Sequence, residues 1–544
     1  MNLMNQINRN NNHFKTKFAF SLLFLSGFFF YLGFKPVNAD SIGQEVIFNI
    51  QSDYDSSSRD TIRASLLMVT NKLYFYVDKN WWTGVLDQDK NIFRADLYTL
   101  ANKFEQNDYV KLITTFGSEP KMNGENHLTI LLCPMPFSIG GYARSIDLYK
   151  SISTNSSNER EMVYLNSAKL LDTPQNKLGA YLAHEFTHLI AIGQKDKKFG
   201  VIDDIWLSEA RAEYSATLLG YDDDFSGSNL EQRMNDFWSS PSVSFLDWQN
   251  NKYNYAAANL FTQYLVDTYG VKVLVDTLQT KEVGVKSINY ALKNNGFNAD
   301  FNQVFQDWMI TVLLNDCSLG NNYCYKNSHL KNFRIFPTGY YYPTTGDGTM
   351  NVSYTTKPYQ GNWYKIVGGK NILKLEFQAQ YGTLFRIPYA VLSKDGKETL
   401  GSLILDSATQ KGAIYIPDFN NKNIALYIMP YNFGKLTGII NPQDGYGYSW
   451  KLSTVTSIGT DSNNNSQCSK FNNNLYFGLR NNNKVKCLQQ FLTSHYSNYY
   501  PSGLVTGNYL SLTFAAVKKL QAFKRLPQTG YFGPLTRGAI NPEL

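Results

Sequence analysis

The chain has 544 residues, of which 43% are hydrophobic, 15% aromatic and 17% charged. This composition is that of a folded protein, and the length favours two to four domains. The formal net charge of +7 falls to +3, from 47 basic and 44 acidic residues, once the four basic residues before residue 40 are set aside. A chain this balanced lacks the concentrated basic face of a nucleic-acid-binding protein, so we expect no nucleic acid partner.

Residues 1–39 are predicted to be a signal peptide. Arg9, Lys15 and Lys17 precede the apolar run FAFSLLFLSGFFFYLGF, and small residues ending at Ala39 stand where a signal peptidase cuts. The alternative is an uncleaved membrane anchor, because 17 mostly apolar residues approach the length of a span. In both cases the positive charges keep the N-terminus inside. We therefore expect a secreted or cell-surface bacterial protein, with the membrane as a partner only under the alternative.

The next part of the chain, residues 40–335, is predicted to form one α+β domain. SIGQEVIFNI, NHLTILLCPMP and REMVYLNSAK have the pattern of strands, whereas WLSEARAEYSATLL and FNQVFQDWMITVLL have that of helices. Strands followed by helices are typical of the α+β class. The sequence leaves open whether residues 40–120 belong to this domain or form a removable propeptide.

The run AHEFTHLIAI places His184 and His188 four residues apart, with Glu185 beside the first. Residues at this spacing share one helix face and can bind one ion, although a lone His on an apolar helix usually packs in the core. A catalytic zinc ion needs three protein ligands and an open position. WLSEARAEY offers Glu209 as the third, 21 residues past His188, and Glu213 one turn later to orient a ligand imidazole. The first helix also carries an apolar stripe expected to face the core: Leu178, Leu182, Phe186, Leu189 and Ile190.

HExxH followed by WLSEARAEY resembles the gluzincin metallopeptidases, which include the thermolysin, aminopeptidase-N and hyicolysin families. The similarity covers about residues 120–275. It implies a thermolysin-like α+β catalytic domain in which His184, His188 and Glu209 bind one Zn²⁺ and Glu185 is the general base. The chemistry of these residues agrees, because zinc brings the pKa of a bound water near neutrality and an adjacent carboxylate can take its proton.

The resemblance also implies residues that contact the substrate. The aminopeptidase-N family stabilises the oxyanion with a tyrosine, and KYNYAAANLFTQYL puts Tyr253 at the matching place, with Tyr255 as the alternative and a packing role possible for either. Gluzincins pair extended peptide backbone with an edge strand. GGYARSIDLY, starting with Gly140, Gly141 and Tyr142, is the candidate, and a hairpin turn is the other interpretation. The sequence lacks the aminopeptidase motif Gly-x-Met-Glu-Asn, which favours cleavage inside chains.

Residues 336–455 are predicted to be an all-β sandwich domain. Runs such as ILKLEFQ and IALYIMPY are short, rich in aromatic and β-branched residues, and separated by turn residues. They contain no cluster of reactive side chains, so we interpret the domain as a spacer or an accessory binding module. The polar stretch at 456–466 predicts a linker.

Residues 467–544 contain an internal repeat, in which a TG turn and a Leu-Thr pair recur 23 positions later. Through NLYFGLRNNNKVKCLQQFL and PQTGYFGPLTRGAI this segment resembles the small all-α peptidoglycan-binding domain of secreted bacterial hydrolases. The resemblance implies peptidoglycan as a partner. Asn482 stands where a Gly is common and GNYLSLT replaces the usual Gly-Pro, so a structural cap without glycan binding is the alternative.

Four of the five cysteines are expected to form two disulfides in an exported protein. Cys317 and Cys324 lie close together, and Cys468 and Cys487 flank the start of the last domain. Cys133 remains, and a buried structural thiol is expected there.

These observations together predict a secreted bacterial zinc metalloendopeptidase that is held at the cell wall by its last domain. A first alternative is a hydrolase of peptidoglycan cross-bridges, which would use the same zinc chemistry. A second is a non-catalytic wall-binding protein with a structural zinc site. Glu185 argues against the second alternative, because a structural site needs no base at that position.

Overall fold

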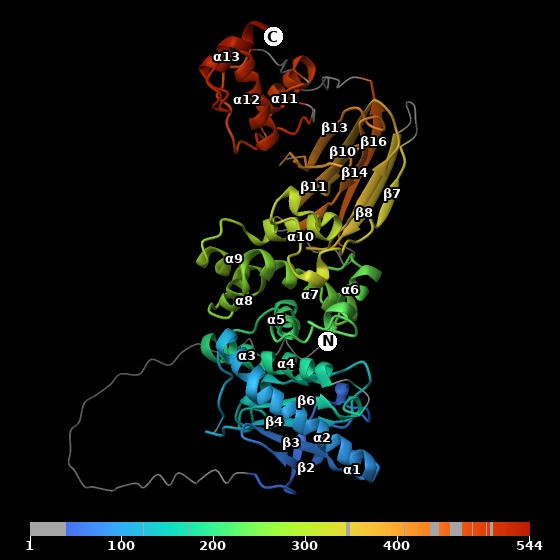
Figure 1. Ribbon diagram of the computed structural model, residues 1–544, viewed down its shortest axis with the longest axis vertical. Coiled ribbons are helices and arrows are strands. Elements are labelled where there is room, and N and C mark those ends of the chain that lie inside the picture. The colour runs from blue at the N-terminus through green and yellow to red at the C-terminus, as the bar shows by residue number, and fades with distance from the viewer. Residues whose placement is uncertain are drawn as a thin grey trace, which may run out of the picture. The chain divides into compact units, whose positions relative to one another are not determined.

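The structure is a computed structural model (Figure 1). It describes residues 40–543 except 123, 172, 174, 344–348, 407–408, 436–444, 457–469, 481, 497 and 501–503. The predicted signal peptide, most of the predicted linker and Cys468 therefore lie outside the described residues. Among those that are described, no helix has the length and apolar character that crossing a membrane requires.

A six-stranded sheet in the order β1-β2-β3-β4-β6-β5 begins the first domain. Its strands are β1 (Glu45–Asn49), β2 (Thr61–Val69), β3 (Leu73–Asp78), β4 (Leu128–Cys133), β5 (Gly141–Ala143) and β6 (Met162–Asn166). Strands β3, β4 and β6 are parallel and almost entirely buried, while β5 pairs antiparallel with β6 at the edge. Residues 40–120 supply half of this sheet, so they are part of the fold.

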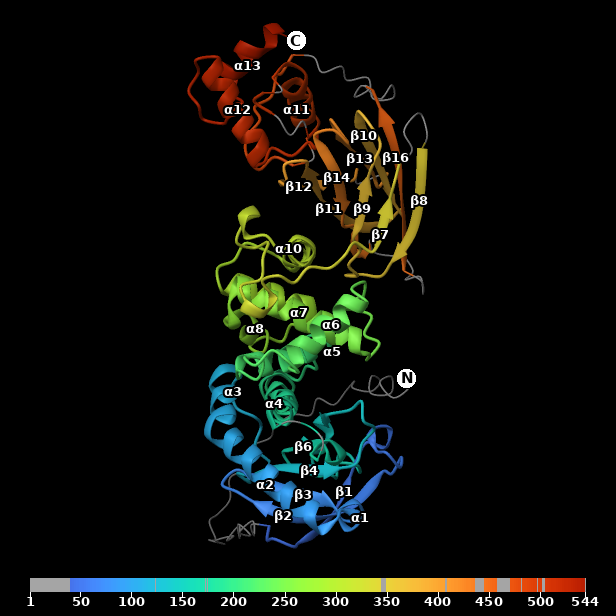
Figure 2. The same cartoon turned by 45° about the vertical axis from the view of Figure 1, so that its right-hand side comes forward.

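Helices cover the sheet and then continue the domain (Figures 1 and 2). Helices α2 and α3 contact α4, which lies against β5 and β6. The bounds of the helices are α1 (Lys79–Gly84), α2 (Asp87–Lys103), α3 (Tyr109–Phe116), α4 (Gln175–Ala191), α5 (Ile205–Leu218), α6 (Asn229–Ser239), α7 (Lys252–Tyr269), α8 (Val271–Asp276), α9 (Gly284–Asn294) and α10 (Phe301–Leu314). Helix α5 packs on both α4 and α7. The site described below lies where α4 and α5 meet.

The cysteines follow the prediction where the structure describes them. Cys317 and Cys324 form a disulfide. Cys487 is also disulfide-bonded, while its predicted partner Cys468 lies outside the described residues. Cys133 is a buried free thiol.

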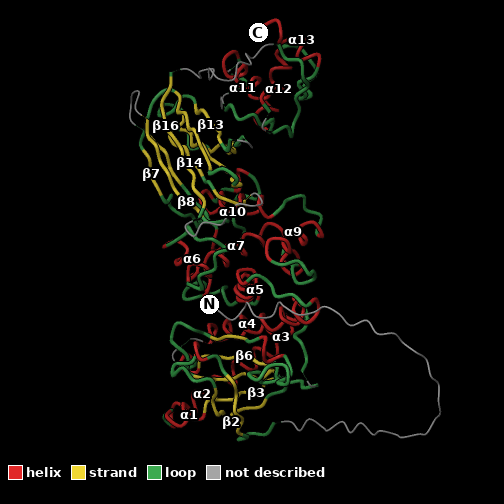
Figure 3. Tube along the Cα trace, turned by 180° about the vertical axis from the view of Figure 1, so that it is seen from behind, coloured by secondary structure: helices red, strands yellow, loops and turns green. Residues whose placement is uncertain are grey.

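Two sheets, antiparallel except where β7 pairs parallel with β9, form the next domain (Figure 3). Four strands have the order β13-β10-β16-β8, and the second sheet has the order β12-β11-β14-β9-β7 with β15 paired to β11. Their bounds are β7 (Gly339–Tyr341), β8 (Thr349–Thr356), β9 (Tyr364–Val367), β10 (Ile372–Ala379), β11 (Thr383–Ser393), β12 (Glu398–Leu403), β13 (Lys411–Ile416), β14 (Asn423–Ile428), β15 (Tyr431–Lys435) and β16 (Tyr446–Val455). Alternate residues of both sheets, including Leu375, Trp450, Ile387 and Leu426, share one core. This is the arrangement of a β-sandwich.

The C-terminal domain consists of α11 (Asn483–His495), α12 (Ser511–Phe523) and α13 (Pro534–Ile540). The structure gives a physical reason for its sequence repeat. Gln489 of α11 accepts hydrogen bonds from the backbone N–H groups of Thr506 and Gly507 at 2.7 Å. Gln521 of α12 accepts one from the N–H of Gly530 at 2.8 Å. Each TG turn is therefore held by a buried glutamine of the helix before it.

Candidate metal centre

Helix α4 presents the two histidines because its apolar stripe fixes its orientation. The five stripe residues are all buried in the core of the first domain: Leu178, Leu182, Phe186, Leu189 and Ile190. His184 and His188 lie beside this stripe, and their side chains keep 18% and 16% exposure. Glu209 of α5 faces them with 15% exposure. The predicted stripe is thus confirmed, and the two helices bring together the three side chains proposed as ligands.

Three ligand atoms converge between the two helices. His184 Nε2 lies 3.2 Å from His188 Nε2 and 3.2 Å from Glu209 Oε2, and His188 Nε2 lies 3.5 Å from the same oxygen. A tetrahedral zinc ion with bonds of 2.0–2.1 Å separates its ligand atoms by about 3.3 Å. Among the described residues, these are the ones found to place three such atoms within 4.8 Å of one another. Their spacing and chemistry fit a zinc ion.

The outer nitrogen of each imidazole also has a partner. His188 Nδ1 lies 3.1 Å from the hydroxyl of Ser208, and His184 Nδ1 lies 3.7 Å from Glu213 Oε1. A proton held on Nδ1 by such a partner leaves Nε2 as a bare lone pair, which is the form that binds a metal. Glu213 was predicted for this role, whereas Ser208 was missed, although it stands directly before Glu209.

Glu213 is itself firmly held. It accepts hydrogen bonds from Arg233 Nε at 2.8 Å and Nη2 at 2.7 Å, from Asn229 at 2.9 Å and from Asn259 at 3.1 Å. Burial alone would raise the pKa of Glu213, but Arg233, His184 and Asn229 together outweigh it, and the pKa lies below its usual value. The carboxylate is therefore charged at neutral pH. Arg233, Asn229 and Asn259 come from α6 and α7, and no local motif in the sequence indicates them.

The pKa values of Glu185 on α4 and Glu209 on α5 are shifted in opposite directions. Burial raises the pKa of Glu185 to about 8, with Glu209 and Glu213 adding to the rise and His188 opposing it. At Glu209 burial also acts upward, but His188 and His184 hold the pKa well below its usual range. A general base works best with a pKa near neutral pH, whereas a metal ligand must stay charged. Glu185 meets the first condition and Glu209 the second.

The ion cluster behind these helices fixes the start of α5. Asp203 lies 2.7 Å from Arg211 Nη2 and 3.1 Å from Lys195 Nζ, and all three side chains are buried. Lys195 also donates to the carbonyl of Thr277 at 2.9 Å. Two charged residues of the segment between α4 and α5, Lys195 and Asp203, are thus turned inward, and their contact with Arg211 joins the segment to α5, the helix that carries Glu209.

Tyr255 lies beside Arg233, the partner of Glu213, with the guanidinium 5.1 Å from its ring centre. Burial raises the pKa of its phenol, and the charges of Glu209, Glu213 and Glu185 raise it further. Tyr253, predicted from the resemblance, instead lies beside Lys252, whose ammonium is 5.1 Å from its ring centre. The structure therefore brings the alternative tyrosine to the site. The reason is helical geometry, because residues two apart on α7 point to different sides.

The glycine-rich segment predicted to bind substrate is the edge strand β5. Gly141 pairs with Leu165 of β6, and no strand among the described residues lies beside the other edge of β5. A Cβ on Gly141 would lie 3.0 Å from the Cγ of Glu185 and 2.6 Å from the carbonyl oxygen of Tyr164. Gly140 in turn lies under the ring of Tyr181. The strand edge and the candidate base are thus neighbours, and only glycine fits between them.

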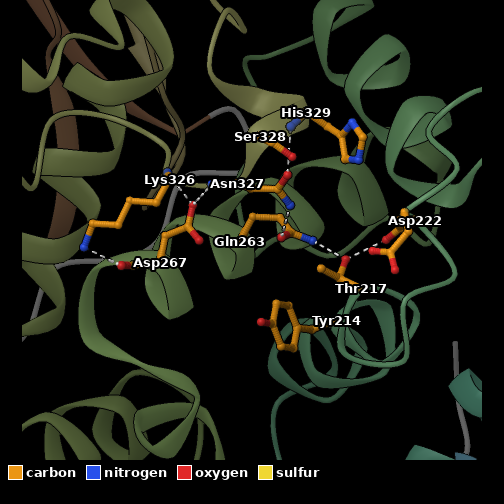
Figure 4. A pocket seen from close by; sticks show the side chains of 10 residues that line it. Tyr214, Thr217, Asp222, Gln263, Asp267, Lys326, Asn327, Ser328 and His329 are labelled. Carbon is orange, nitrogen blue, oxygen red and sulfur yellow. Dashed lines mark hydrogen bonds between the residues drawn. The ribbon is translucent and has the colours of Figure 1, made fainter.

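A polar hollow away from the ligand cluster is lined in part by residues of α5 and α7 (Figure 4). Its lining includes Tyr214, Asp222, Asp267 and His329. Asp222 already accepts hydrogen bonds from Thr217 and from the backbone of Leu230, at 2.6 and 3.1 Å. In the acidic loop YDDDFSG, residues 221–227, this carboxylate therefore links the end of α5 to the start of α6.

Comparisons with known proteins identify the C-terminal domain. The family model of a putative peptidoglycan binding domain matches residues 481–540, which include α11 to α13. This match supports association of the chain with the cell wall and peptidoglycan as a partner. No curated protein matches the chain.

Among solved structures the similarities are low. The surface-associated copper-binding protein CorA of Methylomicrobium album BG8 is 7% identical with a TM-score of 0.17, over 22% of this chain and 98% of that one. The pre-peptidase C-terminal domain of a Bacillus anthracis collagenase is 12% identical with a TM-score of 0.15, over 22% and 97%. The GH115 4-O-methyl-α-glucuronidase BtGH115A is 7% identical with a TM-score of 0.13, over 60% and 51%. Scores this low carry no argument, and none of these comparisons tests the resemblance of residues 120–275 to metallopeptidases.

Proposed function

We propose that the first domain is a zinc metalloendopeptidase and that the C-terminal domain holds it at the cell wall. The observation that carries the proposal is the cluster of His184, His188 and Glu209, whose facing atoms are separated by 3.2–3.5 Å. The buried Glu185 beside this cluster supports a catalytic site over a structural one, since a structural zinc has no use for a costly buried acid.

The chain's own residues divide the work as follows. Zinc, when bound, supplies Lewis acidity toward a water molecule and a carbonyl group. Glu185 accepts a proton from the attacking water and returns it to the leaving amine. Glu213 and Ser208 would keep the imidazoles in the form that binds the ion, and β5 offers its outer backbone edge to an extended peptide. The phenol of Tyr255 stabilises negative charge on the carbonyl oxygen.

The peptidoglycan-binding match favours a second candidate, hydrolysis of peptide cross-bridges in the wall itself. The zinc chemistry would be the same, and only the substrate would differ. Incubation of the zinc-loaded full chain with unfolded polypeptides and, separately, with purified sacculi distinguishes the two. Internal cuts in polypeptides support the endopeptidase. Release of muropeptides without cuts in polypeptides supports the cross-bridge hydrolase, and no product from either substrate would contradict both.

A further inference from the structure

A buried lysine lies beside the beginning of the edge strand β5. Lys169 ends the short turn that follows β6, and it is only 9% exposed. Its Nζ lies 4.7 Å from the ring centre of Phe137, in the segment before β5, and 5.1 Å from that of Tyr181 on α4. Phe137 itself is 71% exposed. The ammonium group is thus covered by two aromatic side chains, one of which lies at the surface.

Two sets of contacts connect this lysine to the metal centre. Lys169 Nζ lies 3.4 Å from the hydroxyl of Tyr181. Tyr181 precedes Glu185 by one turn on the same face of α4, about 6 Å along the helix axis. A Cβ on Gly140 would lie 2.9 Å from the ring of Tyr181, and one on Gly141 would lie 3.0 Å from the Cγ of Glu185. Tyr181 and the candidate base therefore flank successive residues of the segment along which a peptide would pair.

One buried asparagine fixes both segments that carry the lysine and the exposed ring. Asn166, the last residue of β6, donates from its side-chain amide to the carbonyl of Ile139 at 2.9 Å, which holds the segment that contains Phe137. Its Oδ1 accepts from the backbone N–H of Ala168 at 3.1 Å, which holds the turn that ends at Lys169. The backbone at both positions is therefore tied to the strand that pairs with β5.

The ammonium group has more hydrogen-bonding capacity than its surroundings use. It carries three N–H donors. The Tyr181 hydroxyl is its hydrogen-bond partner among the described residues, and no carboxylate of those residues pairs with it. Burial and the charge of Lys177 lower the pKa of Lys169, as expected for a cation without an acidic neighbour. Contacts with aromatic rings offset only part of the cost of burying such a charge, so an anionic group is the partner that this position lacks.

We propose that Lys169 and Tyr181 form a subsite for a carboxylate of the substrate, close to the scissile bond. The carboxylate is either an acidic side chain or the C-terminus of the peptide. This inference rests on the proposed peptidase function and adds a substrate preference to it. The ammonium group would pair with the carboxylate. Because the Tyr181 hydroxyl accepts from Lys169, its own proton can be donated to the same carboxylate.

The test uses pairs of peptides built from one that the wild type cleaves. Each pair differs by Glu and Gln at one position near the cut, and a further pair has a free or an amidated C-terminus. The quantity measured is the ratio of kcat/KM for the acid to that for the amide, with the zinc-loaded full chain. At one position the wild type should favour the acid by about 10-fold, since hydrogen bonds to charged groups are the stronger ones.

Three variants assign this preference. Lys169→Met keeps an unbranched apolar side chain without the charge, and its ratio should fall below about 2-fold. Lys169→Arg keeps the charge and should retain most of the preference. Lys111→Met, which removes an exposed lysine of α3, is the control and should keep the wild-type ratio. A ratio within one protein does not depend on the fraction that is folded or zinc-loaded, so a purely structural role of Lys169 would leave it unchanged.

Binding to the metal-free full chain gives a readout that does not depend on cleavage. Zinc itself attracts carboxylates, so the dissociation constants of the acid and amide peptides are measured without the metal, by calorimetry. The wild type should bind the acid about 10-fold more tightly, and Lys169→Met should bind the two peptides equally.

The outcomes separate this inference from the proposed function. A wild type that cuts none of the peptides would contradict the function and this inference with it. A wild type that cuts them with ratios below about 2-fold at every position would overturn this inference alone. The same holds for a preference that survives in Lys169→Met or is lost in Lys111→Met. A preference confined to the C-terminal pair would identify the terminal carboxylate as the ligand, and one at an internal position an acidic side chain.

Discussion

Replacement of Glu213 by glutamine should weaken zinc binding although Glu213 does not touch the ion. Its Oε1 lies 3.7 Å from His184 Nδ1. The charged carboxylate favours the proton on that nitrogen and so keeps Nε2 free for the metal. Glutamine removes the charge, and because Arg233 donates to both carboxylate oxygens, the NH₂ group meets the guanidinium in either orientation.

The size of the effect follows from the contacts. Loss of the partner that orients a metal-binding His costs about 10- to 100-fold in metal affinity, which corresponds to about 1.4–2.8 kcal/mol. Separately, breaking a buried ion pair costs about 3–5 kcal/mol of folding free energy. The side chain of Arg233 keeps 15% exposure, so we expect the low end of that range, about 3 kcal/mol.

Zinc affinity is measured by competition with a chromophoric chelator, well below the melting temperature of each variant. Two controls separate the causes. Glu231→Gln removes a charge from the same helix as Arg233, where Glu231 bonds the backbone of Gly227, and should bind zinc as the wild type does. Ser208→Ala removes the neutral partner of His188 and should cost less than about 10-fold, because water can replace a hydroxyl. A Glu213→Gln protein with the zinc affinity of Glu231→Gln would refute the reasoning.

Three further changes have defined outcomes. Asp203→Asn should lower the free energy of unfolding by about 3–5 kcal/mol, because it leaves buried cations unpaired. Arg211 and Lys195 depress the pKa of Asp203 below its unfolded value near 4. The stabilisation is therefore present above that pH and is lost as the pH falls through the folded pKa. Denaturant titrations of the wild type and the variant should converge in acid. Gln489→Leu removes the acceptor of the Thr506 and Gly507 N–H groups and should destabilise the C-terminal domain by about 2 kcal/mol, measured by calorimetry. Gln521→Leu is the parallel variant, and unchanged transitions would contradict the role given to these glutamines. Tyr255→Phe should reduce peptide cleavage more than Tyr253→Phe, and the reverse order would return the role to the residue that the sequence indicated.

The ligand helix could be predicted from the sequence because all its signals are local. The spacing of His184 and His188 and the apolar stripe beside them fix both the helix and its buried face. The third ligand followed from one short motif on the next helix. The strands of the sandwich were equally visible, since alternating aromatic and β-branched residues have few other uses.

The residues that surround the ligands could not be predicted, because their roles depend on tertiary contacts. Arg233 reaches Glu213 across 20 positions of sequence. The choice between Tyr253 and Tyr255 depends on which side of α7 faces the site, and the sequence pattern did not settle this. The burial of Asp203 and Arg211 could not be predicted either, because they are buried as partners, whereas each alone would be expected in solvent.

The most direct test of the central claim is a cleavage map made with the wild-type protein and Glu185→Gln. Both are incubated with a mixture of unfolded polypeptides, with and without a zinc chelator, and the products are identified by mass spectrometry. We expect internal cuts by the wild type that disappear with the chelator and in Glu185→Gln, while that variant still binds one zinc per chain. Cuts that persist in Glu185→Gln, or a wild type that binds zinc and cuts nothing, would contradict the claim.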